Sequence, residues 1–147
     1  MPGYHDIRSI EIEATPADCF GVLTDYEQMT DWQSRVCECR VLERDDAGRG
    51  SLVEYAIDAK LRVVRYRLRH TYDEPTWVGS EYVQGDFKNF AGDYRFTDQG
   101  GRTEVRFELT IDPGFRVPGP VTRMLGPTVM GKSLQDLKRR VEELARG

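Results

Sequence analysis

A strict alternation between residues 61 and 72 constrains the fold of this chain more than any other feature. One set of alternating positions is charged or polar: Arg65, Arg67, Arg69 and Thr71. The set between them is Val64, Tyr66, Leu68, His70 and Tyr72. Because successive side chains of a β-strand point to opposite faces, the pattern predicts a strand with one solvated face and one buried face.

The buried row of this strand is not purely apolar. It holds two tyrosines and His70, one of only two histidines in the chain. Each polar tip needs a hydrogen-bond partner once it leaves water. Such groups serve as anchor points in a pocket for a mostly apolar ligand, so this row is a candidate pocket wall.

Length and composition favour one globular domain over residues 1–147. A chain of 147 residues, 31% charged and 39% hydrophobic, is expected to bury roughly 70% of its unfolded surface. The net charge of -4 does not suit nucleic acid, so no nucleic-acid partner is expected. No apolar run approaches the roughly 20 residues of a membrane span, and residues 1–10 lack the apolar core of a signal peptide. We therefore expect a cytoplasmic protein.

The three cysteines do not suggest a metal site. Cys37 and Cys39 lie two residues apart on a predicted strand and should point the same way. Cys19 does not complete a zinc-binding spacing with them. We expect reduced thiols, no metal and no cofactor.

Turn residues and hydrophobic periodicity divide the chain into a simple order of elements. They are a strand at 6–13, short helices at 16–23 and 25–29, strands at 36–44, 50–59, 61–72, 76–84, 89–97 and 103–112, and a long C-terminal helix. Closely spaced strands with short turns rich in Gly and Asp predict an antiparallel meander.

Both short helices have capping signals. Thr15 can cap the first helix, and Pro16 suits its first position. Thr24 and Glu27 have the spacing of a capping box, which predicts the second helix. Trp32 follows and is expected to fill the nearby core.

The same alternation identifies inward positions on the other strands. In the first strand they are Ile10 and Ile12, and in the later strands Val53, Tyr55, Ile57, Val78, Ser80, Tyr82, Phe90, Gly92, Tyr94, Phe96, Val105, Phe107, Leu109 and Ile111. The outward positions carry charges of both signs, which predicts a solvated face with cross-strand ion pairs.

The C-terminal helix has one apolar stripe, with its charged residues, Asp136 among them, expected to lie away from it. The stripe consists of Met130, Leu134, Leu137, Val141 and Leu144. A second stripe at 121, 125 and 128 is out of register with the first, and Gly126-Pro127 predicts a kink or break between them.

This order of elements resembles a known fold. The matching segments are Ala14 to Asp18, Thr24 to Glu27 with Trp32, Tyr72 to Pro75, Gly85 to Lys88 with Gly92 and Phe96, and Val117 to Gly119. Over nearly the whole chain they resemble the START-type, birch-pollen-allergen-like superfamily, in its polyketide cyclase/dehydrase and coenzyme-Q-binding branch. The resemblance implies an α+β helix-grip fold, with a curved antiparallel sheet of about seven strands around the long C-terminal helix. It also implies a cavity between sheet and helix for a hydrophobic small molecule, such as a lipid, an isoprenoid quinone or a polyketide.

Candidate ligand contacts lie on the inward rows and on the covering helix. They are Tyr55, Tyr66, His70, Ser80, Tyr82, Tyr94, Met124 and Met130. Hydroxyls suit the oxygens of a quinone or polyketide, and methionines suit an adaptable wall. The alternative is that they are core residues, which buried tyrosines with satisfied hydroxyls more often are. Ser80 and Gly92 either make room for a ligand or lie beneath Trp77 or Trp32.

His70 allows three interpretations: a core histidine satisfied by a neighbour, a ligand contact, or a general base acting with Tyr66. No Ser–His–Asp motif and no inward carboxylate pair accompanies it, which favours binding without catalysis. A polyketide aromatase/cyclase or dehydratase is the alternative. A ribosome-associated type of interaction module, using a basic outer patch of arginines, is a second alternative. Residues 115–120 are either a lid over the cavity or a connector.

Overall fold

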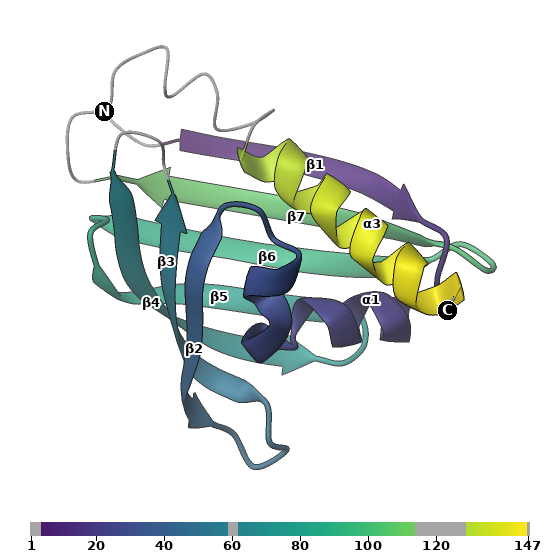
Figure 1. Cartoon of the computed structure of the whole chain (residues 1–147), viewed down its shortest axis with the longest axis horizontal. Helices are drawn as coiled ribbons and strands as arrows, with labels where there is room; N and C mark the ends of the chain where they lie inside the picture. The colour runs from purple at the N-terminus through teal and green to yellow at the C-terminus, as the bar shows by residue number, and fades with distance from the viewer. Residues whose placement is uncertain (1–3, 59–61, 114–128, 147) are drawn as a thin grey trace.

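Seven antiparallel strands form one curved sheet that wraps around the C-terminal helix in this computed structural model (Figure 1). The structure describes residues 4–58, 62–113 and 129–146. The strands are β1 (Tyr4–Ile12), β2 (Val36–Arg44), β3 (Gly50–Asp58), β4 (Val63–Asp73), β5 (Trp77–Gly85), β6 (Asn89–Asp98) and β7 (Thr103–Asp112). The helices are α1 (Pro16–Leu23), the 3-10 helix η1 (Tyr26–Asp31) and α3 (Gly131–Arg146). The helix-grip fold is therefore confirmed.

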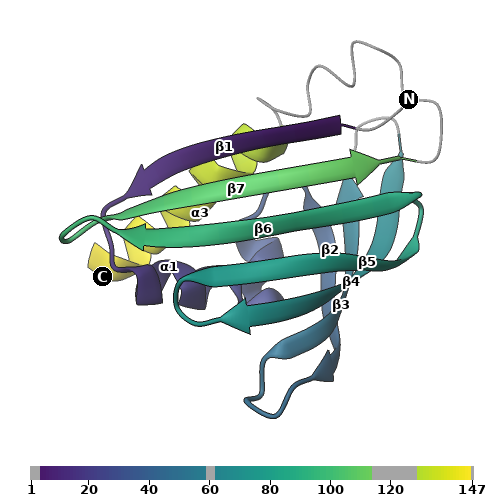
Figure 2. The same ribbon diagram turned by 180° about the vertical axis from the view of Figure 1, so that it is seen from behind.

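The sheet is a meander completed by the first strand. Its order is β1-β7-β6-β5-β4-β3-β2, so strands β2 to β7 each pair with their neighbours in sequence and β1 pairs with β7. The helices α1, η1 and α3 lie on one face of the sheet, and in the view from behind no helix of the described residues covers the opposite face (Figure 2). The core lies between the inner face and the helices, where Trp32 is 5% exposed as expected.

One of the two predicted helix caps is wrong. The Thr15 hydroxyl accepts a hydrogen bond from the Asp18 amide at 3.2 Å, which confirms the cap of α1. The Thr24 hydroxyl instead donates to the Phe20 carbonyl at 2.8 Å and so helps to end α1. The 3-10 helix η1 begins at Tyr26, and Asp25 before it makes no side-chain cap.

The two faces of β4 are as the alternation predicts. Val64, Tyr66, Leu68 and His70 are each at most 8% exposed. On the outer face, Arg67 pairs with Glu54 at 2.9 Å, Arg65 with Glu38 at 3.2 Å and Arg69 with Glu43 at 3.6 Å. Such exposed pairs contribute well under about 1 kcal/mol each. The outer arginines thus belong to a solvated, charge-paired surface.

Two predictions for α3 are wrong. Leu144 is 56% exposed, because the end of the helix faces a surface groove. Asp136 is fully buried and accepts hydrogen bonds from the Ser34 amide at 3.0 Å and hydroxyl at 2.7 Å. Its second oxygen lies 3.3 Å from Lys132 Nζ and 3.2 Å from Arg139 Nη1. Burial raises the pKa of Asp136, but the hydrogen bonds from Ser34 and the contact with Lys132 outweigh it and leave that pKa below the ordinary value. Asp136 therefore fastens α3 to the segment after η1.

The two neighbouring cysteines occupy different environments. An irregularity in the pairing of β2 with β3 lies between Val36 and Glu38. Cys37 is exposed and Cys39 is half-buried, contrary to the regular alternation expected for this strand.

Several predicted features lie outside the described residues. They are the kink at Gly126-Pro127, the stripe at 121, 125 and 128, the segment 115–120, and Met124. Within the described residues, no helix is long and apolar enough to cross a membrane.

Candidate functional site

His70 lies at the centre of a closed group of polar aromatic side chains. Its Nε2 is 2.7 Å from the Tyr55 hydroxyl, and its Nδ1 is 2.9 Å from Ser80 Oγ and 3.4 Å from the Gly79 carbonyl. A neutral ring with its proton on Nδ1 donates toward Gly79 or Ser80 and accepts from Tyr55, so both nitrogens are satisfied.

Burial lowers the pKa of His70 to about 4, and the contact with the Gly79 carbonyl offsets only part of this effect. The ring is therefore neutral at pH 7. A base this weak takes a proton poorly at neutral pH, which weakens the interpretation of His70 as a general base.

Tyr26, from η1, covers this group from the helix side. Its ring stacks on His70 with the ring centres 5.0 Å apart. Its hydroxyl lies 2.7 Å from that of Tyr72, which donates to the Gly50 carbonyl at 2.5 Å. A Cβ at Gly50 would lie only 3.0 Å from the Tyr26 ring, so the small residue makes this contact possible. We call Tyr26, Tyr55, His70 and Tyr72 the His70 cluster.

A second aromatic group lies further along the same inner face. It consists of Tyr66, Tyr82, Phe87 and Phe90, and we call it the aromatic rim. The Tyr66 ring centre is 5.0 Å from that of Phe87 and 5.4 Å from that of Phe90. Tyr66 also stacks on Tyr55 at 5.3 Å, which joins the rim to the His70 cluster. Tyr82, Phe87 and Phe90 are only half-buried.

The tyrosine hydroxyls of the inner face differ in what they bind. That of Tyr82 donates to the Phe87 carbonyl at 2.6 Å and so fixes the turn between β5 and β6. That of Tyr94 is hydrogen-bonded to Ser133 on α3, and burial raises the pKa of Tyr94 to about 12. Among the described residues, none forms a hydrogen bond with the Tyr66 hydroxyl. Tyr66 thus has a polar tip available to a ligand.

The small residues are only partly as expected. Ser80 is engaged by His70. Trp77 lies on the outer face over Gly79, where a Cβ would lie 2.3 Å from the indole. The alternative that Ser80 or Gly92 lies beneath Trp77 is therefore wrong. Gly92 instead faces Leu109, whose Cδ1 would lie 3.4 Å from an added Cβ.

Polar groups on β1 were missed. Asp6 Oδ2 lies 3.1 Å from both the Tyr4 hydroxyl and Arg8 Nε. Asp6 pairs with Leu109 across the strands, so this half-buried carboxylate lies on the inner row, where none was expected. Alternation backwards from Ile10 would have found it. The Tyr4 hydroxyl also lies 3.7 Å from the sulfur of the buried Met130.

The arrangement offers little for catalysis. Ser80 and His70 have the contact of a nucleophile and a base, but the other ring nitrogen of His70 meets a tyrosine and not a carboxylate. The described residues contain no group of three or more His, Cys, Asp or Glu placed to hold a metal ion.

Comparisons place this geometry among known folds. A family model described as polyketide cyclase/dehydrase and lipid transport matches residues 8–142. A search of curated proteins gives no match.

Solved structures of the same fold cover almost the whole chain. A START superfamily protein from Mycobacterium smegmatis has a TM-score of 0.86 at 21% identity, over 95% of this chain and 98% of its own. A protein from Thermus thermophilus has a TM-score of 0.79 at 22% identity, over 98% and 99%. A Streptomyces aromatase/cyclase has a TM-score of 0.77 at 16% identity, over 98% and 94%. At these identities the likeness establishes the fold alone.

Proposed function

This chain belongs to the polyketide cyclase/dehydrase and lipid transport family, and from that premise we propose that it binds a hydrophobic small molecule against the inner face of its sheet. The proposed ligand is a lipid, an isoprenoid quinone or a polyketide, held between the sheet and α3. The proposed contacts are the aromatic rim and Tyr94, with Met130 on the helix side.

The aromatic rim is the observation that carries this proposal. Three of its four rings, those of Tyr82, Phe87 and Phe90, are only half-buried, although they pack against the core on the inner side of the sheet. Covering large aromatic side chains with further apolar surface lowers the free energy of the complex. The Tyr66 hydroxyl supplies the single polar anchor that an apolar pocket uses to orient a ligand.

The proposal is tested with purified protein and two variants of matched chemistry. Native mass spectrometry is expected to detect a copurified lipid-sized adduct. In calorimetric titration with a short-chain isoprenoid quinone and a medium-chain fatty acid, Tyr66→Phe is expected to weaken binding of the preferred probe about tenfold, the value of one hydrogen bond.

Tyr72→Phe is the control, because Tyr72 lies in the His70 cluster outside the aromatic rim and its hydroxyl is already bonded to Tyr26 and Gly50. It is expected to leave ligand affinity unchanged. No adduct together with no binding of either probe would contradict the proposal, and so would equal losses in both variants.

An aromatase/cyclase or dehydratase remains the second candidate. It is favoured by the contact between Ser80 and His70 and by the shared fold of the Streptomyces aromatase/cyclase. In that case Ser80→Ala would abolish turnover of an aromatic polyketide while leaving its binding intact. The low pKa of His70 counts against this candidate. The ribosome-associated alternative relied on a basic outer patch of arginines. These arginines are paired with glutamates, which counts against that alternative.

A further inference from the structure

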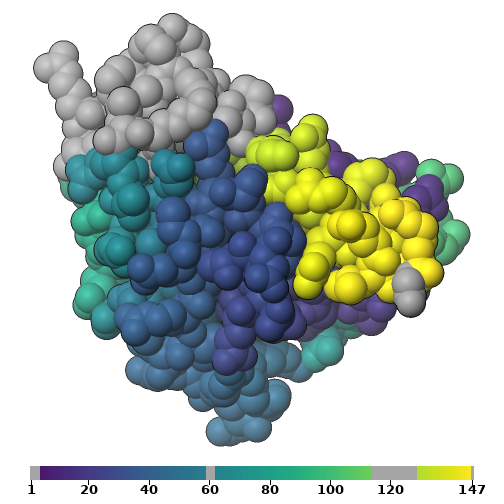
Figure 3. Space-filling view, in the orientation of Figure 1, coloured from purple at the N-terminus to yellow at the C-terminus, as the bar shows by residue number. Residues whose placement is uncertain are grey.

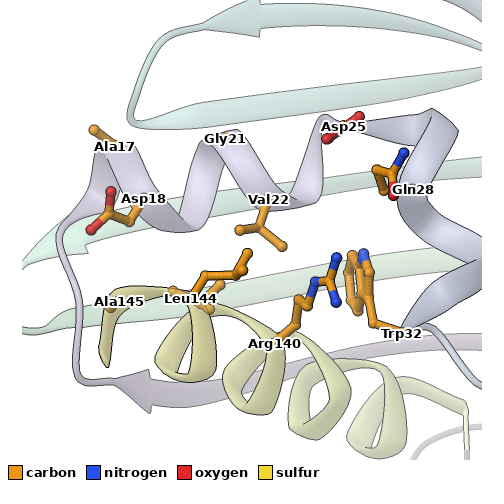
Figure 4. A pocket seen from close by; sticks show the side chains of 11 residues that line it. Ala17, Asp18, Gly21, Val22, Asp25, Gln28, Trp32, Arg140, Leu144 and Ala145 are labelled. Atoms are coloured by element: carbon orange, nitrogen blue, oxygen red, sulfur yellow. The ribbon is translucent and has the colours of Figure 1, made fainter. Parts of the chain in front are cut away.

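A groove of about 290 Å³ lies between α1 and α3 on the side of the helices away from the sheet. Its apolar part is formed by Gly21 and Val22 on α1 and by Leu144 on α3 (Figure 4). Asp25 and Arg140 line its other end, beside Trp32. In the space-filling view α3 is at the surface, beside the early part of the chain (Figure 3). This groove is separate from the inner face of the sheet.

The apolar part of the groove combines a projecting side chain with an open space. Leu144 is 56% exposed, the largest exposure among the large hydrophobic residues of the described chain. A Cβ placed at Gly21 would meet nothing within 4 Å. When two helices pack, projecting side chains of one helix fit into open surface of the other. Leu144 can supply the projecting side chain, and the surface at Gly21 can receive one.

The charges of the groove are separated between its two walls. Asp18 and Asp25 lie on the α1 side, and Arg140 lies on the α3 side. Elsewhere on α3, Lys138 pairs with Glu142 at 2.7 Å. Among the described residues, no ion pair or side-chain hydrogen bond engages the charged groups of Asp18, Asp25 or Arg140. The groove therefore presents an acidic wall and a basic wall that are both free to bind.

Helices α1 and α3 run in opposite directions, and this determines which of their residues lie at the same level along the groove. Figure 4 shows Leu144 level with Gly21, and Arg140 level with Asp25. A two-fold axis along the groove would place α3 of a second copy opposite α1, at the same level along the axis. Arg140 of each copy would then face Asp25 of the other, and each Leu144 would face the open surface at Gly21.

We propose that this groove is the interface of a symmetric homodimer. A second copy matches both the shape and the charges of the groove. The α1 wall has the carboxylate of Asp25 and the open surface at Gly21, and the α3 wall of the partner copy would bring an arginine and a leucine to them. The four contacts form two identical pairs, as an isologous interface requires. The dimer needs no ligand on the inner face of the sheet.

Sedimentation velocity of the full chain at increasing concentration tests the proposal. The expected result is a concentration-dependent shift from the 16.9 kDa chain to twice that mass. Asp25→Arg and Arg140→Asp should each raise the dimer dissociation constant about 100-fold, since each places like charges together at two symmetric positions. The double variant, which exchanges the charges, should restore the constant to within about threefold of the original.

Two further variants separate loss of the interface from loss of the fold. Gly21→Leu fills the open surface and should weaken the dimer, while the thermal midpoint of the chain stays equal or rises because leucine favours helix. Val83→Thr, at an exposed strand position away from the groove, is the control and should change neither quantity.

A mass of one chain at every concentration up to about 200 μM would overturn the proposal, since the dissociation constant of a stable dimer lies well below that concentration. It would also be overturned by a dimer that is indifferent to the single charge reversals, or by a double variant that stays monomeric.

Discussion

The His70 cluster and the aromatic rim lie on the same inner face, share ring contacts and are built from similar residues, yet they differ in how they are covered. In the cluster, η1 brings Tyr26 down onto His70, and each polar atom of that histidine finds a partner. At the rim, three of four rings are only half-buried, and the Tyr66 hydroxyl has no partner among the described residues. Polar aromatic residues on a strand thus form a core or a pocket wall according to what lies above them.

The largest expected contrast between the two regions is in stability. Tyr26→Ala removes a ring that is 4% exposed and should lower the free energy of unfolding by about 4 kcal/mol. Phe90→Ala removes a half-buried ring and should cost about 1–2 kcal/mol while weakening ligand binding. Urea denaturation measures both, and equal losses would mean that the two regions are equally packed.

The hydrogen bonds of the cluster predict the next largest effect. His70→Phe leaves the hydroxyls of Tyr55 and Ser80 without their partner and should destabilise the chain by about 3 kcal/mol. Tyr55→Phe removes one partner only and should cost about 1–2 kcal/mol. If His70→Phe abolished ligand binding without loss of stability, the cluster would have to be assigned to the site.

A pH dependence of about 2 kcal/mol should follow from His70. Its pKa is about 4 in the folded chain and about 6.5 when unfolded, so the unfolded chain takes up the proton first. Stability is then full above pH 6.5 and falls as pH drops toward 4, by about 2 kcal/mol between pH 8 and pH 5.

Urea denaturation at several pH values measures this slope, and the His70→Phe variant is its control. The variant should lack the His70 part of the pH slope. The same slope in both proteins would show that His70 does not change its proton affinity on folding.

The smallest effect is expected on the outer face of the sheet. Arg69→Ala breaks an exposed pair with Glu43 and should change stability by less than about 0.5 kcal/mol. Ligand affinity should not change. A large loss of either would indicate that the outer face does more than remain solvated.

Local patterns predicted the strands and their faces because alternation depends only on neighbouring residues. The row from Val64 to Tyr72 and the helix capped by Thr15 are examples. The pattern also contained Asp6, which alternation from Ile10 places inward, although it was overlooked.

Contacts between segments that are far apart in the chain could not be predicted from the sequence patterns. Tyr26 contacts His70 because η1 packs against β2 and places this ring over β3 and β4, and no sequence periodicity predicts that contact. The helical pattern predicted a solvated Asp136, but in the fold it is buried and hydrogen-bonded to Ser34, which is 102 residues away in sequence. Leu144 continued an apolar stripe, but the helix carries it past the core to the groove.

Aromatic-ring NMR during ligand titration tests most directly whether the rim, and not the His70 cluster, is the ligand wall. The probes are a short-chain isoprenoid quinone, a medium-chain fatty acid and an aromatic polyketide. We expect at least one probe to shift the ring signals of Tyr66, Phe87 and Phe90 while leaving those of Tyr26 and His70 nearly unchanged. Shifts confined to Tyr26 and His70, or no shift with any of the three probes, would contradict the assignment.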